Sequence, residues 1–233
     1  FVGPEHGLTL ASGRVQGLAR VVPLGLEAGQ FVVAATDNGA PVLAVVDASG
    51  VERKAIRGLG LASAACATVQ FAAATATVVA TGDAAKAAIG KAQVAGWVGV
   101  AATACGGGDG ALAVAKKHAS ERIAFGKPLL VQEAVQRKLV ECKRGLDAAR
   151  QLAWHAARLH DLGQDATEAA IGARLAAVDA MVAAGDEGIQ ILGGFGYTVE
   201  YHVERHYRDG KVFDVLDGGG EGLRNKLAAL QFA

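Results

Sequence analysis

The segment with the clearest capacity for chemistry lies near the end of the chain, where Asp217–Glu221 reads Asp-Gly-Gly-Gly-Glu. A carboxylate can remove a proton as a general base, and glycines at the start of a helix leave backbone N–H groups open to an anionic ligand. The same residues also read as a plain turn between a short strand-like run (212–216) and a terminal helix (221–230). Composition alone leaves both interpretations open.

A second glycine cluster, Gly193–Tyr197, reads Gly-Gly-Phe-Gly-Tyr and follows a long apolar stripe. One glycine at that place is what a helix C-cap needs, because glycine adopts the left-handed conformation without a steric penalty. Three glycines in four residues exceed that need. They would also let the backbone approach a flat or phosphorylated ligand closely.

Two further patterns suggest a metal or a nucleotide. His202 and His206 are spaced to share a helix face, but no third ligand is evident, so we expect no metal site. Gly106–Ala111 contains the spacing of a dinucleotide-binding turn, but no second strand follows its helix. A stretch of small residues where helices approach closely explains these glycines better.

Two kinds of element must position these segments. From residue 8 to residue 81, short apolar runs alternate with turn residues, as in 30–35, 41–46 and 66–71. Runs of this length between turn signals predict antiparallel strands.

In the rest of the chain the apolar residues recur with the helical period. A first helix is predicted over about 84–121, and a second begins after Pro128 and ends at Gly163. Asp165, with Glu168 three residues later, predicts a capping box at the start of a third helix. The apolar faces of the second and third helices are formed by Val131, Val135, Leu139, Cys142, Leu146, Ala149 and Ala153, and by Ile171, Leu175, Val178, Val182, Gly185, Ile189 and Leu192.

The predicted fold class is therefore α+β. An antiparallel β-domain portion occupies residues 1–82, and an up-down helical bundle occupies residues 83–233. Helices with such long apolar stripes must bury them against one another, which is why a bundle is expected.

The composition excludes several classes of protein. The chain has 233 residues, with 23 basic and 23 acidic side chains and an apolar fraction of 52%. The balanced charge argues against nucleic-acid binding, and no run reaches the length of a membrane span. The scattered cysteines Cys66, Cys105 and Cys142 suggest neither a disulfide framework nor a zinc site and predict a reducing cytoplasm. Because the chain starts at Phe1, we expect its true N-terminus to be missing.

Four segments, in this order and at this spacing, resemble the acyl-CoA dehydrogenase family of flavoproteins. They are Arg122-x-x-Phe125-Gly126-Lys127-Pro128, the run 190–197, Glu200-Tyr201-x-Val203-Glu204-Arg205 and the run 207–211. The resemblance covers roughly residues 83–230, which correspond to the C-terminal helical domain of the family. The first 80 residues resemble, more weakly, the later part of its middle β-domain, while its N-terminal helical domain is missing.

The resemblance implies an FAD-dependent oxidoreductase that forms the α,β double bond of an acyl-CoA thioester. In the family a carboxylate removes the α-proton while a hydride passes from the β-carbon to flavin N5. The resemblance implies Asp217 as the catalytic base. It implies cofactor contacts by Arg122 and Phe125 at the adenine nucleotide, by Gln190, Gly193 and Gly194 along the FAD of a neighbouring subunit, and by Gly219 and Glu221 beside the base.

The base segment departs from the family pattern, which usually reads Glu-Gly-Thr-Ser followed by Glu or Gln. Asp217 keeps the carboxylate but is one methylene shorter, and a misplacement near 1 Å can lower a rate about 10²-fold. Gly219 lacks the hydroxyl that the family places near the flavin. Some members carry the base on the helix before the Arg-x-x-Phe-Gly motif, but residues 114–120 contain no carboxylate.

Two hypotheses follow from the resemblance. The chain is a catalytic acyl-CoA dehydrogenase with Asp217 as its base, or it is a non-catalytic partner that shares an FAD site in a heteromeric enzyme. Such pairs occur among bacterial enzymes that act on steroid side-chain CoA thioesters, and the weakened base motif favours this second hypothesis. Either implies an acyl-CoA substrate from fatty acid or steroid side-chain catabolism, a homo- or heterotetramer in the cytoplasm, and an electron-transfer flavoprotein as acceptor. Neither implies a nucleic-acid or membrane partner.

Overall fold

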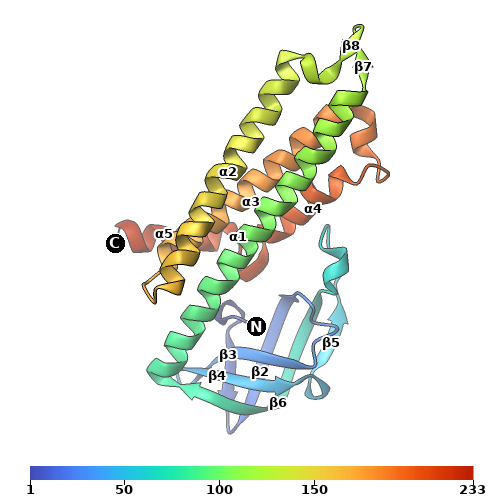
Figure 1. Cartoon of the computed structure of the whole chain (residues 1–233). Helices are drawn as coiled ribbons and strands as arrows, with labels where there is room; N and C mark the ends of the chain where they lie inside the picture. Colours follow the sequence, from blue (N-terminus) through green and yellow to red (C-terminus); the bar gives the residue numbers. More distant parts are fainter. Residues whose placement is uncertain (233) are drawn as a thin grey trace. The chain divides into compact units, whose positions relative to one another are not determined.

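A computed structural model describes residues 1–232, which fold into two compact units (Figure 1). The first unit is Phe1–Gln93 and the second begins at Val94. The long helix α1 (Gly82–Glu121) starts in the first unit and continues into the second. The change from strands to helices that the sequence predicts near Gly82 is where α1 begins. Each unit is described separately.

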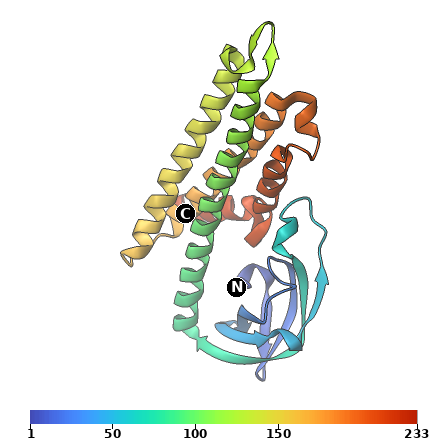
Figure 2. The same ribbon diagram turned by 45° about the vertical axis from the view of Figure 1, so that its right-hand side comes forward.

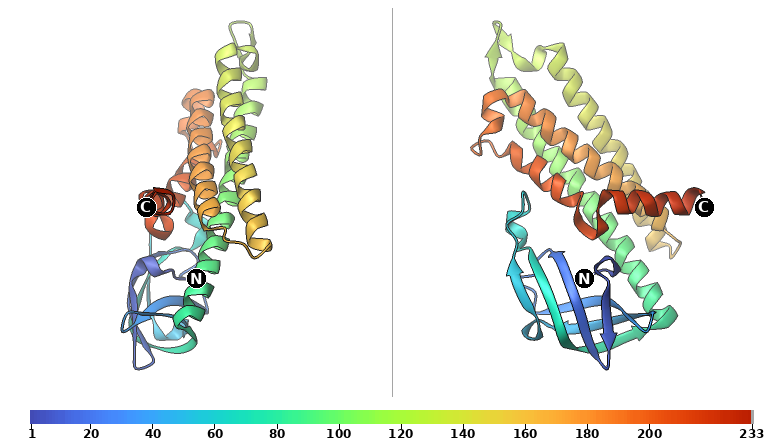
Figure 3. Two further views of the ribbon diagram at one scale, coloured as in Figure 1. Left: turned by 90° about the vertical axis from the view of Figure 1, so that its left-hand side faces the viewer. Right: turned by 180° about the vertical axis from the view of Figure 1, so that it is seen from behind.

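The first unit is a closed sheet with one appended strand. Its strands are β1 (Leu8–Ala11), β2 (Arg14–Val22), β3 (Gln30–Asp37), β4 (Ala40–Asp47), β5 (Glu52–Ala55) and β6 (Ala67–Thr81). The pairing order is β2-β1-β3-β4-β6, and β2 also pairs with β6, which closes the ring, while β5 pairs only with β6 (Figure 3). All pairings are antiparallel except β1 with β3, so the predicted antiparallel β-domain portion is confirmed with one parallel exception.

Alternating side chains fill the inside of this sheet. Phe31 and Phe71 meet edge to face, with ring centroids 5.9 Å apart, and both are buried. The period-2 pattern of strands such as β4, in which Val42, Ala44 and Val46 are buried, accounts for the register.

The second unit is the predicted up-down helical bundle. Helix α1 is followed by α2 (Glu133–Asp161), α3 (Thr167–Leu192), α4 (Val203–Phe213) and α5 (Gly219–Phe232). Successive helices from α1 to α4 run in opposite directions, and α3 packs against both α2 and α4 (Figures 1 and 2). A short hairpin, β7 (Ile123–Ala124) and β8 (Lys127–Pro128), joins α1 to α2. Single turns of 3-10 helix follow at η4 (Leu129–Val131), η5 (Gly193–Tyr197) and η6 (Leu216–Gly218).

Glycines in the middle of α1 allow close approach between helices. A Cβ atom added to Gly107 would lie 2.5 Å from Met181, and one added to Gly108 would lie 2.4 Å from Leu146. A Cβ atom on Gly110 would lie 2.7 Å from the ring of His206. The Gly106–Ala111 segment is therefore a helix-packing surface, as the small-residue interpretation predicts.

Two local predictions are wrong. The strand-like run 212–216 contains no strand, because Val212 and Phe213 continue α4, where Phe213 is buried, and Leu216 begins η6. The capping box at α3 also does not form. Asp165 accepts a hydrogen bond from the Thr167 N–H at 2.9 Å, but Glu168 accepts one from the side chain of Gln231 instead of closing the box.

Helix α1 also corrects the expectation that no run is long enough for a membrane span. By length and composition alone it could cross a membrane. Its apolar character comes largely from alanine, and within the second unit its buried positions recur at helical spacing, as in the core helix of a bundle. They include Trp97, Ala101, Ala104, Ala111, Ala115 and Ala119. Length and composition are weak evidence for a membrane span when a core helix passes the same test.

Candidate functional site

The carboxylate of Asp217 is presented by a sharp turn between α4 and α5. Asp217 has φ 54° and ψ 44°, and it is followed by Gly218 at φ 88° and Gly219 at φ 78°. Three successive residues with positive φ reverse the chain, and aspartate is one of the few non-glycine residues that tolerate this conformation. The Asp217 side chain is 45% exposed.

The buried guanidinium of Arg174, which no sequence motif indicated, contacts this turn from α3. The side chain of Arg174 in α3 is 2% exposed, and its Nη1 donates to Asp217 Oδ2 at 2.7 Å. Its Nη2 donates to the carbonyl oxygens of Phe213 at 3.0 Å and Leu216 at 2.6 Å. Among the residues that the structure describes, Arg174 is the one charged side chain classed as buried. A buried cation needs such partners, because its desolvation is otherwise uncompensated.

The other two predicted residues of this turn differ in setting. Gly219 is half-buried, and a Cβ atom added to it would lie 3.4 Å from the carbonyl oxygen of Asp214. The Glu221 side chain is 86% exposed and lies 3.6 Å from Arg224 in the first turn of α5. A negative charge in the first turn of a helix interacts favourably with the helix macrodipole. Both residues lie beside Asp217, as predicted, and their role toward a cofactor stays a prediction.

The hairpin between α1 and α2 carries Arg122 and Phe125. The carbonyl of Arg122 accepts from the Leu129 N–H at 2.8 Å, so the backbone is anchored while the guanidinium is exposed. Phe125 occupies the turn at φ 55° and is 95% exposed. A hydrophobic ring so fully in solvent buries no surface within this chain, which favours a role in contacting something else.

Gln190, Gly193 and Gly194 lie where α3 ends. Gly193 has φ 61° and ψ −133°, a conformation suited to glycine, and its N–H caps the helix on the carbonyls of Ile189 and Gln190. Gly194 is not constrained in this way. A Cβ atom added to it would meet nothing within 4 Å, so its backbone borders open space. Gln190 is exposed at the same helix end.

The hairpin and the end of α3 lie at one end of the bundle (Figures 1 and 3). The ring of His118, on the last turn of α1, is 6.1 Å from Phe195 and 6.2 Å from Tyr201, measured between centroids. Residues Ala119, Leu129, Ile191 and Leu192 belong to one apolar cluster beneath them. The structure thus brings together five of the predicted cofactor residues, namely Arg122, Phe125, Gln190, Gly193 and Gly194.

These residues fit the adenine-nucleotide half of FAD. An exposed guanidinium suits a pyrophosphate and an exposed aromatic ring suits an adenine face. Because Gly194 has no side chain, a ligand could approach its backbone through space that a Cβ atom would otherwise fill. The Asp217 turn is elsewhere, because Arg174 precedes Gln190 by 16 residues on the same helix, which is about 24 Å of helix rise. The predicted site residues therefore form two separate groups within the chain.

A signal for Arg174 was present in the sequence. It is the only basic residue of α3 and stands among apolar residues, Ala170–Ala177, most of which are buried. A lone cation on the buried side of a central helix requires an anionic or carbonyl partner. Its partners, however, lie about 40 residues further along the chain, and spacing could not have identified them.

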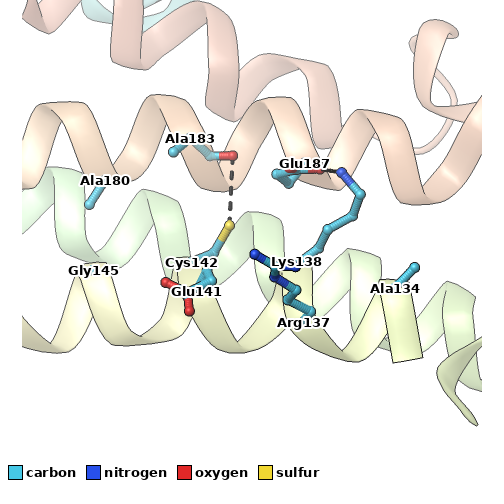
Figure 4. A pocket seen from close by; sticks show the side chains of 9 residues that line it. All are labelled: Ala134, Arg137, Lys138, Glu141, Cys142, Gly145, Ala180, Ala183 and Glu187. Atoms are coloured by element: carbon cyan, nitrogen blue, oxygen red, sulfur yellow. Dashed lines mark hydrogen bonds and ion pairs between the residues drawn. The ribbon is translucent and has the colours of Figure 1, made fainter. Parts of the chain in front are cut away.

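A groove between α2 and α3, with a volume of about 510 Å³, contains none of the predicted site residues (Figure 4). Lys138 pairs with Glu187 across it, and the Cys142 thiol donates to the Ala183 carbonyl at 3.8 Å. Burial raises the pKa of the Cys142 thiol, with the nearby Glu187 carboxylate acting in the same direction. Such a thiol is a poor nucleophile, so these groups tie the helices together.

The two histidines considered for a metal have different surroundings. His206 lies against Gly110 of α1, and burial lowers its pKa, helped by the charge of Arg205. His202 is exposed at the start of α4. Within residues 1–232 no group of three or more His, Cys, Asp or Glu side chains is arranged to hold a metal ion.

Comparison with known proteins gives consistent sequence matches. The family model "Acyl-CoA dehydrogenase, C-terminal domain" matches residues 96–231. The human mitochondrial short-chain specific acyl-CoA dehydrogenase is 40% identical over 133 residues, which are 57% of this chain and 32% of that protein. An acyl-CoA dehydrogenase of Bacillus subtilis is 39% identical over 126 residues, which are 54% of this chain and 33% of that protein. The chain thus spans about a third of the length of these relatives.

Solved structures are similar over nearly the whole chain. Butyryl-CoA dehydrogenase from Megasphaera elsdenii has a TM-score of 0.86 and 27% identity, covering 96% of this chain and 62% of its own. A variant of the Tcur3481-Tcur3483 steroid ACAD has a TM-score of 0.86 and 25% identity, covering 98% and 63%. A chain solved in work on the electron transferring flavoprotein of Acidaminococcus fermentans has a TM-score of 0.86 and 29% identity, covering 97% and 63%.

Proposed function

Because the chain belongs to the acyl-CoA dehydrogenase family, we propose that it acts in the FAD-dependent α,β-dehydrogenation of an acyl-CoA thioester. It contributes the C-terminal helical domain and part of a β-domain to an enzyme or to one of its subunits. The observation that carries this proposal is the convergence of five exposed residues from the hairpin and the end of α3 at one end of the bundle.

These residues would hold the nucleotide half of the cofactor. Arg122 would pair with the pyrophosphate, Phe125 would pack on the adenine, and the backbone at Gly193 and Gly194 would approach the ligand closely. When bound, FAD supplies the hydride acceptor of the reaction. Since these residues lie near the C-terminal end of α3, and Arg174 beneath the Asp217 turn lies about 24 Å along that helix from Gln190, the arrangement supports a cofactor site completed by a second subunit.

On the first candidate function, Asp217 is the base that takes the α-proton of the thioester. Its carboxylate is accessible and held in a fixed place by the Arg174 guanidinium. The positive φ angles of Gly218 and Gly219 keep the turn tight beneath it. The residues of this chain would thus orient a carboxylate toward substrate.

A second candidate function is a non-catalytic subunit of a heteromeric acyl-CoA dehydrogenase. The Arg174–Asp217 pair favours it, because a carboxylate that pairs with a buried guanidinium already has a structural role. The similarity to a steroid ACAD whose name joins two components supports the same assembly and a steroid side-chain substrate. A cytoplasmic heterotetramer with an electron-transfer flavoprotein as acceptor completes this proposal.

Replacing Asp217 by asparagine separates the two candidates. Asparagine keeps an oxygen that can accept from Arg174 and removes only the ability to take a proton. If Asp217 is the base, kcat of the purified holo-assembly falls at least about 10³-fold while flavin content is unchanged. If a partner chain supplies the base, kcat stays within about threefold of wild type. Steady-state kinetics on the flavin-loaded assembly, with flavin absorbance as the control, measures this.

Replacing Arg122 by alanine tests the cofactor group. We expect FAD affinity to fall about tenfold or more, because a charge-assisted contact to phosphate is lost in a partly desolvated site. Arg158→Ala is the matched control, since Arg158 is exposed near the opposite end of the bundle, where α2 ends. The ratio of flavin to protein absorbance after gel filtration gives the result. Unchanged flavin content in a normal oligomer of the Arg122 variant would contradict the assignment.

A further inference from the structure

We infer that Arg174 is a positioning residue that clamps the turn carrying Asp217 and fixes its carboxylate. The clamp itself follows from contacts within the second unit. Its consequence for turnover rests on the proposed function, with Asp217 as the base. Arg174 belongs to a different helix from the turn, so it acts on the carboxylate across the bundle rather than along the chain.

The first part of the clamp holds the backbone. Phe213 is the last residue of α4, and the carbonyls at a helix C-terminus have no partner within the helix. Arg174 Nη2 donates to the Phe213 carbonyl and also to that of Leu216, which begins η6. One buried cation thus caps α4 and pins the entry to the turn. The positive charge of Arg174 also interacts favourably with the macrodipole at the C-terminus of α4.

The second part holds the side chain. Arg174 Nη1 donates to Asp217 Oδ2 while Nη2 is occupied by the carbonyls, so the two ends of the planar guanidinium grip different parts of the same turn. The exit is closed separately, because the Gly220 N–H donates to the Asp214 carbonyl at 2.8 Å. The carboxylate therefore sits on a loop that is fixed at both ends.

The side chains of Arg174 and Asp217 differ in exposure, and this difference shows which of them holds the other in place. Arg174 is 2% exposed and has no access to water in place of its partners, whereas Asp217 is 45% exposed and can be hydrated without Arg174. The buried guanidinium thus depends on the turn for the hydrogen bonds that offset its desolvation, and the turn depends on the guanidinium for its conformation. Loss of Arg174 is expected to leave a hydrated carboxylate on a loosened loop.

The test compares Arg174→Met and Arg174→Lys in the flavin-loaded assembly. Methionine keeps the volume without donors, and lysine keeps the charge with donors on a single nitrogen that cannot reproduce the fork. Arg224→Met is the matched control, because Arg224 contacts Glu221 and Asp179 near the same turn but is 42% exposed. The readouts are amide hydrogen exchange of residues 214–220, flavin content, kcat and KM.

For Arg174→Met we expect exchange of the 214–220 amides to speed up at least tenfold. We also expect kcat to fall at least tenfold with KM within threefold and flavin retained. Arg174→Lys restores part of both, and the Arg224 variant changes neither. Unchanged exchange in a folded Arg174→Met or Arg174→Lys variant overturns the clamp. Faster exchange with unchanged kcat overturns the positioning role. A wild-type assembly that oxidises no acyl-CoA overturns the proposed function instead, while exchange still reports the clamp.

Discussion

Replacing Gly185 by alanine is expected to lower the free energy of unfolding of the helical unit by about 2 kcal/mol, the range for an overpacked core. Gly185 lies in α3 where α4 crosses it. An added Cβ atom would be 2.7 Å from the backbone nitrogen and 2.8 Å from the Cα atom of Tyr207. These are main-chain atoms and cannot rotate away, so the two helices must separate.

Gly172→Ala is the matched control for this prediction. Gly172 is in the same helix, but a Cβ atom there would meet nothing within 4 Å. Helix propensity then acts alone, and we expect a gain of up to about 1 kcal/mol. Denaturant unfolding followed by tryptophan fluorescence isolates this unit, because Trp97 and Trp154 both belong to it. A Gly185 variant as stable as the Gly172 variant would show that α3 and α4 are not in this close contact.

Leu146→Ala is expected to lower the free energy of unfolding by about 3 kcal/mol, through lost burial and the cavity left behind. Leu146 of α2 is fully buried and packs into the space left by the missing side chain of Gly108. The glycine on α1 and the leucine on α2 form one complementary contact. Neither helix can close the gap without losing its other contacts.

Leu152→Ala, on the same helix, controls for helix propensity and for the chemistry of the substitution. Leu152 is 44% exposed, so we expect a loss below about 1 kcal/mol. The same fluorescence-detected unfolding experiment measures both variants. Equal losses at the two positions would contradict the packing of Leu146 against α1.

The helical half of the fold was predictable because its signal is local. The apolar stripe from Val135 to Ala153 predicts the buried face of α2. Pro128 precedes the helix and Gly163 follows it, so these two residues indicate roughly where it begins and ends. The predicted stripe of α3 underestimates its burial, since α3 packs on both α2 and α4 and is buried over a wider arc. A stripe in one sequence does not reveal how many neighbours a helix will have.

The failures share a cause in long-range packing. The run 212–216 has strand-like residues, but Phe213 continues α4 and is buried with it. Glu168 has the spacing for a capping box, but its carboxylate accepts a hydrogen bond from the side chain of Gln231 in α5 instead. Burial of Phe213 goes with the helix at the first place, and a partner distant in sequence binds the carboxylate at the second.

The candidate site divides in the same way. The positions of Asp217, Gly193 and Phe125 followed from motifs, because turns and helix ends are written in local sequence. The buried partner of Asp217 did not, because Arg174 precedes it by 43 residues and meets it only when α3, α4 and η6 are assembled. Motifs located the candidate groups, and only the tertiary structure located what holds them.

Helix α3 contributes at both of its ends, with Arg174 gripping the carboxylate turn and Gln190 lying in the cofactor group about 24 Å away. In an assembly that shares cofactor sites between subunits, as proposed, one copy of this helix would serve two different catalytic centres. In such an assembly, a subunit damaged at its cofactor end would have a dominant-negative effect on a neighbour's centre. Two subunits damaged at opposite ends would regain one intact centre when mixed, which is intragenic complementation arising from the length of a single helix.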